Sequence, residues 1–554
     1  MSTQFSFVGK QVLIVDDQRA FQIMLRSMLQ NFGATDFHFA ASGEAAIRTC
    51  QKYSFDILLV DYNLGTGKNG AQLLEELRLT KAISPSALYI IISGDNNRSM
   101  VLNALEMEPD DFLTKPFSQY QLINRIARAY QKRQELLPIY THLDEHQYQS
   151  AVETCKSYIR DQGRYQSYCH NLMIESFIHL QDYENAHIHL CQQLKEHPQT
   201  WALATLGQVQ FLMGDYAKSI HTLELVIEEH PLILLAYDHL AKAYRANNQL
   251  PEALSIIQKA NQISPYSISR QQLMAELALD SHNLSLAKET FGRILQLARR
   301  SIHRGPQHLC NFIRSLIDEA QNEEDLYRKN RLLQEVNSVL HKARYEEGNY
   351  DGFDFEAFEG LSQARVHATK GEMHRAKQIL FSSNEGALES PEQIDDILLP
   401  DTFLTLNSVG EYEYAVPLAD ELKKRDKLEY FSTLIANKLA DSPAFVERLD
   451  TFRALNHQGI TSYSEGNYLK ACQYFRKALK EAPGNTGAIL NKIQAILKFL
   501  ETSTGRHLSE LEECKQAIKS LDGLHLSESH KQRLQSLREE FETLVNLRNS
   551  GSRS

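Results

Sequence analysis

The stretch VLIVDD at residues 12–17 decides the fold of the N-terminal part, because an apolar run ends there in two carboxylates. Residues 21–32 then carry apolar side chains at helical spacing. Further apolar runs lie at 57–60, 88–92 and 112–114, with predicted helices near 43–52, 70–80, 98–107 and 118–132. Continuous apolar runs that alternate with helices indicate a parallel sheet covered on both faces. We therefore expect an α/β domain with a doubly wound parallel sheet over residues 1–130.

Polar residues follow each apolar run: Asp16, Asp17, Asp61, Ser93 and Lys115. Parallel sheets bind ligands outside the carboxyl ends of their strands, where these side chains would converge. Three carboxylates would repel one another there unless a divalent cation neutralised them, and Mg²⁺ accepts one or two protein carboxylates together with phosphate oxygens. A single Asp at a strand end usually caps a turn. Five such residues in order favour a phosphoryl-transfer site with one carboxylate as nucleophile.

The motifs VLIVDD, LLVDYNL, IIISG and FLTKPF match, in order, those of the receiver domain of bacterial two-component response regulators. Residues 10–130 resemble that family, which implies a flavodoxin-like sheet of five strands and a histidine kinase or phosphotransfer protein as phosphodonor. The resemblance implies that Asp61 is the phosphoacceptor. It further implies that Mg²⁺ is held by Asp16, Asp17, Asp61 and the Asn63 backbone. Ser93 and Lys115 would contact the phosphoryl group. Phe112 would be the switch aromatic, and Pro116 would follow a cis peptide bond.

The loop after Asp61 departs from the family. Gly65 stands where a proline is usual, and the segment GTGKNG at 65–70 has one extra residue. No Walker spacing occurs, so we interpret the segment as a flexible loop and not as an ATP site. Every residue needed to form the phosphorylated state is present. The departure therefore concerns the lifetime of that state and not its formation.

The rest of the chain repeats with a period of 33–34 residues. Prolines stand at 198, 231 and 265, and the residue twelve positions before each is small: Ala186, Ser219 and Ala253, followed by Ala287 one period later. This pattern resembles the tetratricopeptide repeat, in which two antiparallel helices cross closely at a small residue and the second ends near a proline. The resemblance implies an all-α superhelix.

We predict four clear repeats over 133–300 and a helical joint over 301–354, with two long helices at 306–346 and a turn-rich segment at 348–354. A degenerate array of repeats is expected over 355–540. Its clearest unit is 452–485, and a frayed polar tail is expected at 548–554.

Stacked repeats form a concave groove that binds peptides. The resemblance assigns the groove to the second, fifth, ninth and twelfth positions of each repeat: Tyr168, Asn171, Trp201, Gln208, Asp238, Lys242 and Arg245. Trp201 is the single tryptophan, and the alternative for it is core packing. The lysine and asparagine pattern that clamps chaperone tails in some relatives is not seen at these positions.

The composition excludes several classes of function for this chain. Lys and Arg number 59 against 70 Asp and Glu, a net charge of −11, which disfavours nucleic-acid binding because that rests on contacts from basic residues to phosphate. The seven cysteines lie far apart without a C-x-x-C motif, which predicts free thiols in a reducing cytosol. The 21 histidines lack zinc spacing. No signal peptide or membrane span is recognised, so we expect a cytoplasmic protein without membrane insertion.

No hydrolase, metalloprotease or kinase motif occurs, so we expect no enzymatic output beyond the domain's own phosphotransfer and autodephosphorylation. The sequence favours a phosphorylation-switched adaptor whose repeats bind a partner protein. The alternative is a constitutive scaffold whose receiver serves as a kinase-docking module or phosphate sink, and a DNA-binding transcription factor is disfavoured by charge. We further hypothesise an autoinhibitory contact, in which the face formed by Phe112 and the helices on either side of its strand docks on the first repeat, near 133–160. A homodimer is compatible with both parts.

Overall fold

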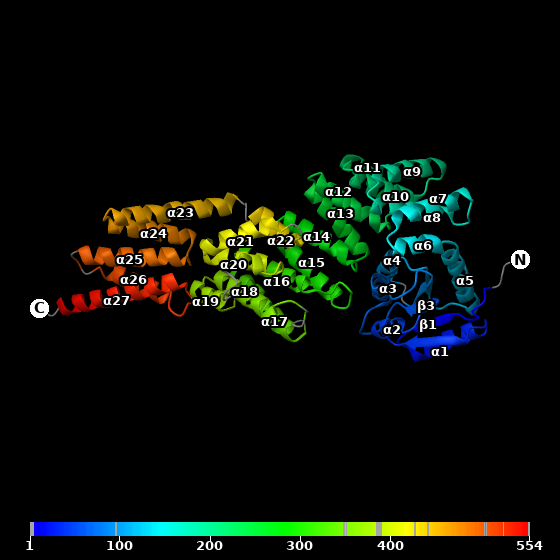
Figure 1. The fold of residues 1–554 in the computed structure, drawn as a ribbon, viewed down its shortest axis with the longest axis horizontal. Coiled ribbons are helices and arrows are strands. Elements are labelled where there is room, and N and C mark those ends of the chain that lie inside the picture. Colours follow the sequence, from blue (N-terminus) through cyan, green and yellow to red (C-terminus); the bar gives the residue numbers. More distant parts are fainter. Residues whose placement is uncertain are drawn as a thin grey trace. The chain divides into compact units, whose positions relative to one another are not determined.

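The computed structural model describes residues 5–94, 97–346, 350, 352–383, 390–425, 428–439, 443–503, 505, 507–524 and 526–551. It forms two compact units, Met1–Arg304 and Gly305–Ser554. Figure 1 traces the elements of each. Within the described residues, no helix is long and apolar enough to cross a membrane. All seven cysteines are free, as predicted, and six of them are buried.

The first unit begins with a parallel sheet in the order β2-β1-β3-β4-β5. Its strands are β1 (Gln11–Val15), β2 (Asp36–Ala40), β3 (Ile57–Asp61), β4 (Leu88–Ser93) and β5 (Asp111–Thr114). The expected five-stranded α/β fold is confirmed. The sequence did not locate β2, because this edge strand is only partly buried and lacks the continuous apolar run of the central strands.

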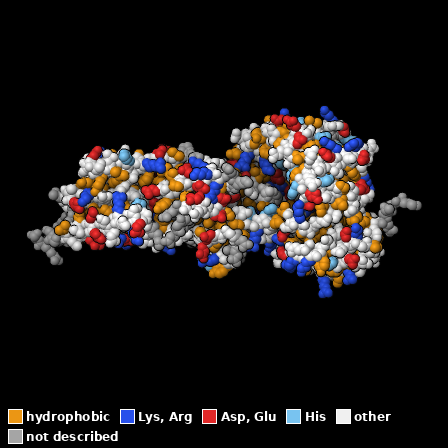
Figure 2. Space-filling view, viewed as in Figure 1, with side chains coloured by type: hydrophobic (Ala, Val, Ile, Leu, Met, Phe, Trp, Pro, Cys, Tyr) orange, Lys and Arg blue, Asp and Glu red, His pale blue; other side chains and the backbone are white. Residues whose placement is uncertain are grey.

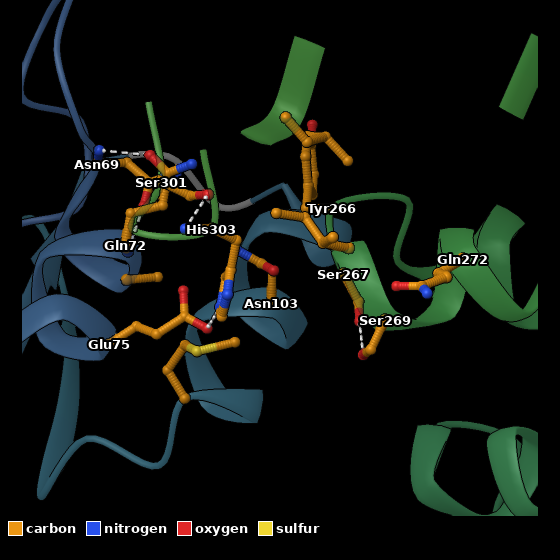
Figure 3. A pocket seen from close by; sticks show the side chains of 14 residues that line it. Asn69, Gln72, Glu75, Asn103, Tyr266, Ser267, Ser269, Gln272, Ser301 and His303 are labelled. Carbon is orange, nitrogen blue, oxygen red and sulfur yellow. Dashed lines mark hydrogen bonds and ion pairs between the residues drawn. The ribbon is translucent and has the colours of Figure 1, made fainter. Parts of the chain in front are cut away.

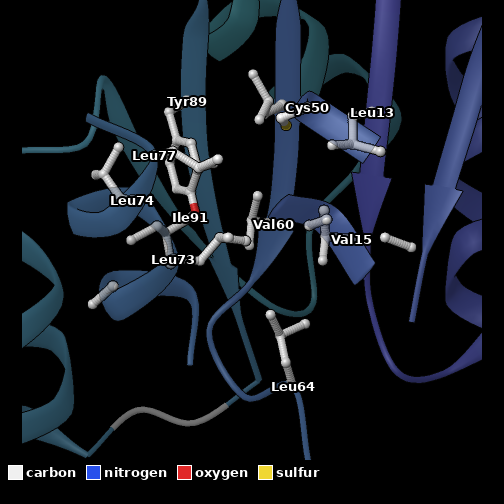
Figure 4. Packing of buried hydrophobic residues seen from close by; sticks show 14 of the residues in the cluster. Leu13, Val15, Cys50, Val60, Leu64, Leu73, Leu74, Leu77, Tyr89 and Ile91 are labelled. Carbon is white, nitrogen blue, oxygen red and sulfur yellow. The ribbon is translucent and has the colours of Figure 1, made fainter. Parts of the chain in front are cut away.

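Helices cover both faces of the sheet: α1 (Arg19–Gln30), α2 (Gly43–Cys50), α3 (Gly70–Leu79), α4 (Arg98–Glu106) and α5 (Gln119–Glu135). Successive strand residues point to opposite faces, so Leu13 and Val15 belong to one core cluster and Val12 and Ile14 to the other. Figure 4 shows the first cluster, in which the Tyr89 hydroxyl donates to the Gly70 carbonyl at 2.7 Å. That bond fixes the start of α3 beside β4.

Ten further helices of the first unit follow the sheet domain. They are α6 (Leu137–Asp144), α7 (Tyr148–Arg160), α8 (Gln166–His179), α9 (Tyr183–Glu196), α10 (Thr200–Leu212), α11 (Tyr216–Glu229), α12 (Leu234–Ala246), α13 (Leu250–Ile263), α14 (Ile268–Asp280) and α15 (Leu284–Ala298). We call α6–α15 the N-terminal array. The four small residues aligned by the sequence period are all 0% exposed, where helices of a pair cross: Ala186, Ser219, Ala253 and Ala287.

The crossing of α10 and α11 shows why small residues stand there. The Ser219 hydroxyl donates to the Gly207 carbonyl at 2.7 Å. A Cβ on Gly207 would lie 2.5 Å from Cδ2 of Leu223, closer than carbon atoms approach. Any larger side chain at this crossing must push the two helices apart.

Replacing Ser219 by leucine is therefore expected to destabilise the first unit by about 1–3 kcal/mol, the usual cost of overpacking a core. Urea unfolding followed by Trp201 fluorescence measures it, since the single tryptophan lies in this unit. Lys218→Leu, at a side chain 69% exposed on the same helix, is the matched control and should leave the midpoint nearly unchanged. Equal midpoints for both variants would contradict the close crossing.

The second unit is helical apart from one 3₁₀ turn, η2 (Pro391–Gln393), and a π-helical segment, η3 (Ile435–Leu439), among its described residues. Its helices are α16 (Pro306–Asn322), α17 (Leu326–Glu346), α18 (Phe355–Thr369), α19 (Met373–Ser383), α20 (Leu399–Val409), α21 (Tyr412–Lys424), α22 (Tyr430–Leu434), α23 (Pro443–Ser464), α24 (Tyr468–Glu481), α25 (Thr486–Thr502), α26 (Leu508–Lys519) and α27 (Glu528–Gly551). The two long helices expected at 306–346 are α16 and α17. Of the predicted turn at 348–354, residues 348, 349 and 351 lie outside the described residues.

The clearest predicted repeat, 452–485, corresponds to the later part of α23 and all of α24. Its small residues pack as those of the first unit do: Ala471 and Ala478 are 0% exposed, and a Cβ on Gly459 would lie 2.5 Å from Cε1 of Phe475. The helix α27 extends to Gly551, into the polar tail expected at 548–554, whose fraying stays a prediction. Residues 552–554 lie outside the described part.

Candidate functional site

The predicted polar residues of the sheet domain stand at the carboxyl ends of β1, β3, β4 and β5. Asp16 is 2% exposed, Asp61 8% and Ser93 4%. The strand order puts β1 and β3 side by side, with β4 next, so three buried polar groups share one edge of the sheet.

Lys115 joins two of these groups. Its Nζ lies 2.8 Å from Oδ1 of Asp61 and 3.1 Å from Oδ2 of Asp16. Burial raises the pKa of Asp61, the Lys115 charge opposes that rise, and the nearby charge of Asp16 adds to it. One lysine thus faces two buried carboxylates, and the edge keeps a net negative charge when both are ionised.

Asp17 and Asn63 frame this edge. The Asp17 side chain is exposed, and Oδ2 would lie 3.5 Å from a Cβ on Gly65. The Asn63 backbone N–H donates to Oδ2 of Asp61 at 3.1 Å, which orients the Asp61 carboxylate. The structure brings Asp16 and Asp61 together and leaves Asp17 at the rim.

The other predicted residues of this edge are Ser93, Phe112 and Pro116. The Lys115 backbone N–H donates to the Ser93 carbonyl at 2.7 Å, and the Lys115–Pro116 bond is cis. Phe112 is half-buried against the core cluster that contains Val60 and Tyr62. Ser93 and Phe112 therefore stand on the adjacent strands β4 and β5, as a coupled movement of the two would require.

Lys68 and Asn69 of the loop at 65–70 make contacts outside the loop, and its flexibility stays a prediction. Lys68 Nζ donates to the Arg300 carbonyl at 2.9 Å and pairs with Glu76 at 3.0 Å. The Asn69 side chain caps α3. A Cβ on Gly70 would lie 2.7 Å from the Asp61 carbonyl oxygen, so the glycine is required by close packing behind the site. The extra residue lengthens a loop that reaches the N-terminal array.

The donor set of the edge fits Mg²⁺. Within the described residues, no three His, Cys, Asp or Glu side chains are gathered as a metal cluster. Mg²⁺ needs only one or two protein carboxylates, however, and keeps waters and substrate oxygens as its other ligands. The paired carboxylates of Asp16 and Asp61, balanced by a single ammonium group, meet that requirement.

A hydrogen bond leads from the edge to α4. Tyr62 follows Asp61 in the chain, and its hydroxyl accepts from Nδ2 of Asn103 at 3.1 Å. Both side chains are at most 5% exposed. Asn103 also lines a cavity of about 250 Å³ between the sheet domain and the N-terminal array. Figure 3 shows Asn69, Gln72, Glu75 and Asn103 on one side of this cavity and Ser269 and Gln272 on the other.

The sheet domain contacts the N-terminal array, and the segment that follows it, through α3, α4 and α5. Glu75 Oε1 lies 2.8 Å from Nε2 of His303, and Glu106 at the end of α4 pairs with Arg270 of α14. The first repeat contributes as well: Lys81 Nζ donates to the Asp144 carbonyl at 2.6 Å, and the Tyr158 hydroxyl donates to Oε2 of Glu135 at 3.1 Å. The helices on either side of the Phe112 strand thus both contact the array: α4 through Glu106, and α5 through Arg133, whose guanidinium lies 4.2 Å from the ring centre of Tyr140 in the first repeat. The hypothesis of docking at 133–160 as an autoinhibitory contact stays a prediction. No sequence pattern indicated the Glu106–Arg270 pair, whose partners lie 164 residues apart.

The predicted groove residues are already engaged in several places. Asp238 pairs with Arg270 at 2.8 Å, and Arg245 pairs with Glu276 at 2.7 Å and with Asp280 at 2.9 Å. The ring of Tyr168 lies 4.3 Å from Nζ of Lys132. The others are half-buried or exposed: Asn171, Trp201 and Gln208 are half-buried and Lys242 is exposed. Trp201 also packs against the cluster that contains Leu206 and Val209, as the core alternative proposed.

Glu175, which the sequence reading missed, stands at a ninth position of the repeat and so belongs to the groove. Surrounding protein atoms raise its pKa to about 7, although the side chain still reaches solvent, and the charge of Glu108 in the sheet domain adds to the rise. The Glu108 charge acts on Glu175 only while the receiver lies against the array, so this part of the rise makes the carboxyl bind a proton more readily in the docked state. Docking should therefore weaken as pH rises from about 5 to about 7 and level off above that.

Hydrogen exchange of α4 between pH 5 and pH 8, corrected for intrinsic rates, is expected to show this trend, and Glu175→Gln to flatten it. Glu153→Gln, at an exposed glutamate of the neighbouring α7, is the control and should keep the wild-type profile. A Glu175→Gln profile that matches the wild type would remove this carboxyl from the docking equilibrium.

Comparisons with known proteins agree with this geometry. Residues 12–127 match the family model described as the response regulator receiver domain, and residues 452–485 match that of the tetratricopeptide repeat. The chain is 28% identical over 122 residues to chemotaxis protein CheY of Thermotoga maritima, covering 22% of this chain and 98% of CheY. It is 34% identical over 120 residues to cell cycle response regulator CtrA of Brucella ovis, covering 21% of this chain and 48% of CtrA, so it spans about half of that relative.

Among solved structures, a CheY-like receiver domain from Methanospirillum hungatei is 22% identical, with a TM-score of 0.21 and coverage of 23% of this chain and 97% of that one. MamA from Desulfovibrio magneticus is 23% identical, with a TM-score of 0.26 and coverage of 29% and 91%. The chain thus carries a response regulator receiver domain at its N-terminus and a tetratricopeptide repeat near its C-terminus.

Proposed function

We propose that this chain, a receiver domain followed by helical repeats, is a phosphorelay response regulator that works as a phosphorylation-switched adaptor. Asp61 accepts a phosphoryl group from a sensor histidine kinase or a phosphotransfer protein in the cytosol, and the repeats bind a partner protein. The observation that carries the proposal is the Lys115 bridge between buried Asp16 and Asp61, on a domain whose α4 contacts the N-terminal array.

The transfer step follows from the geometry of the edge. An Asp61 oxygen attacks phosphorus, an O–P bond forms, and the P–N bond to the donor histidine breaks. Lys115 Nζ, now 2.8 Å from Asp61, then contacts the transferred phosphoryl oxygens, and the Ser93 hydroxyl is placed on the next strand. Asp16, Asp17, Asp61 and the Asn63 carbonyl would hold Mg²⁺, which would offset the negative charge that builds up during the transfer.

Phosphorylation can reach the repeats through α4. A new dianionic group at Asp61 competes for Lys115 and draws Ser93 toward it. Tyr62 is the next residue in the chain and is bonded to Asn103, so a displacement at Asp61 bears directly on α4. We propose that this movement loosens the contact of α4 with the N-terminal array.

Hydrogen exchange of the full chain with acetyl phosphate and Mg²⁺ tests the proposal. We expect faster exchange in α4 and α14 on phosphorylation, unchanged exchange in α24 of the second unit, and no response in Asp61→Asn. A chain that is modified on a phosphate-affinity gel but keeps its exchange in α4 and α14 would instead support the constitutive scaffold.

The proposed output is protein binding. On the face shown in Figure 2, basic and acidic side chains are interspersed, without the broad basic surface that phosphate backbones require. Concave repeat arrays present extended surfaces to other proteins. The receiver catalyses only its own phosphotransfer and dephosphorylation in this proposal.

A further inference from the structure

The concave side of the N-terminal array faces the receiver domain. The 34-residue period also identifies two groove positions in the last repeat. Gln272 lies one period after Asp238, and Ser269 lies two periods after Trp201. Ser269 and Gln272 line the cavity whose opposite wall is α3 and α4 (Figure 3). Groove positions of α14 therefore lie toward the receiver, and Tyr168, a groove position of α8, lies against Lys132 of α5.

Arg270 is the centre of this contact. Its side chain is 1% exposed and is held by Asp238 of α12 on one side and by Glu106 of α4 on the other. The Ser264 hydroxyl donates to Oε2 of Glu106 at 3.1 Å, and Arg270 also donates to the Ser264 carbonyl at 3.1 Å. Both oxygens of the Glu106 carboxylate are engaged, so the array holds a carboxylate in a built, largely buried pocket.

An apolar contact accompanies the ionic one. Leu102, one helical turn before Glu106, packs against the core cluster of the array that includes Ala204, Leu240 and Leu273. Residues four apart lie on the same face of a helix. One face of α4 thus presents a leucine and a glutamate to the array. Amphipathic helices bind in the grooves of partner proteins through side chains arranged in this way.

We propose that the groove of the N-terminal array is a receptor for an acidic amphipathic helix with the spacing Leu-x-x-x-Glu, and that α4 is its resident, autoinhibitory occupant. The external partner presents a helix of this type, and its glutamate takes the place of Glu106 on Arg270. This rests on the proposed function, to which it adds the chemistry of the partner and the surface it uses.

Tethering explains why such a groove stays closed. A segment of the same chain competes at an effective concentration of the order of mM, so a free helix of equal intrinsic affinity is excluded. Phosphorylation that loosens α4 would lower this competition without changing the groove itself. Partner binding and phosphorylation are then coupled, and each favours the other.

A stapled helical peptide of residues 97–111 with a fluorescent label is the probe, and the full-length chain is the receptor. Glu106→Lys opens the groove by placing a second cation against Arg270. We expect this variant to bind the peptide at least about 10-fold more tightly than the wild type, since a charge-assisted contact of α4 is lost. Glu145→Lys, an exposed glutamate at the end of α6, is the charge-matched control and should bind as the wild type does.

A second peptide, with lysine at the position of Glu106, separates recognition from folding of the receptor. We expect it to bind Glu106→Lys about 10-fold or more weakly than the native peptide, because it meets Arg270 with like charge. Equal binding of the two peptides, or no binding of the native peptide to Glu106→Lys, overturns the proposal. If the opened variant discriminates but acetyl phosphate leaves wild-type binding unchanged, the receptor groove stands and the phosphorylation switch fails.

Discussion

Asp61→Asn is expected to show no phosphorylated band with acetyl phosphate and Mg²⁺ under conditions that shift the wild-type chain fully. An amide is not a nucleophile toward phosphorus, and the substitution also removes the ion pair of 2.8 Å with Lys115. Labelling should fall by at least about 100-fold, the scale of effect that follows loss of a reacting group. A phosphate-affinity gel measures it.

Stability separates loss of chemistry from loss of fold in this variant. Burial and the Asp16 charge both raise the pKa of Asp61, so its ionised form is disfavoured in the folded state. Replacing it with a neutral amide should leave the unfolding midpoint equal to that of the wild type or higher. A variant that is neither phosphorylated nor folded would not show that Asp61 is the acceptor. The unfolding midpoint must therefore be measured together with the labelling.

Asp56→Asn is the matched control. Asp56 precedes β3 at the opposite end of the strand and pairs with Lys10 at 3.2 Å. It is a carboxylate of the same domain that the site does not use, so labelling should persist. Persistent labelling of Asp61→Asn itself would show that another residue is the acceptor.

The receiver site could be predicted from the sequence because each of its residues directly follows a buried strand. Four apolar runs fixed the strands, and parallel pairing brought their ends to one edge. The same reasoning failed for β2, whose edge position leaves its side chains partly exposed and removes the continuous apolar signal. It also could not foresee that Asp16 and Asp61 share one lysine while Asp17 stays at the rim.

The groove was predicted only as a set of positions. Period and helix geometry fix which residues of a repeat lie on the concave side, and the buried small residues at the crossings agree with that register. What covers a groove depends on tertiary contacts between distant segments. Arg270 and Glu106 have no common motif and lie 164 residues apart, so no local pattern marks their pairing.

The second unit provides the other large effect. Arg314 of α16 is 0% exposed, and Nε and Nη2 donate to Oδ2 of Asp401 in α20 at 3.0 and 2.6 Å. The third donor, Nη1, donates to Oδ1 of Asn311 at 2.8 Å. Asp401→Asn keeps the shape of this network but leaves a buried guanidinium whose other acidic neighbour, Glu429, lies 3.7 Å away on a partly exposed side chain.

Removing one partner of a buried ion pair costs about 3–5 kcal/mol, so Asp401→Asn should strongly destabilise the second unit. Far-UV circular dichroism follows the loss of helix in both units, and Trp201 fluorescence reports the first unit alone, so a transition seen only by circular dichroism belongs to the second unit. The double variant Arg314→Met with Asp401→Leu should recover most of the loss, because it removes both charges and fills the space with apolar groups. If the double variant were as unstable as Asp401→Asn, lost packing would explain the effect better than an uncompensated charge. Recovery would instead show that the ion pair fixes the geometry of α16 and α20 without being their main source of stability.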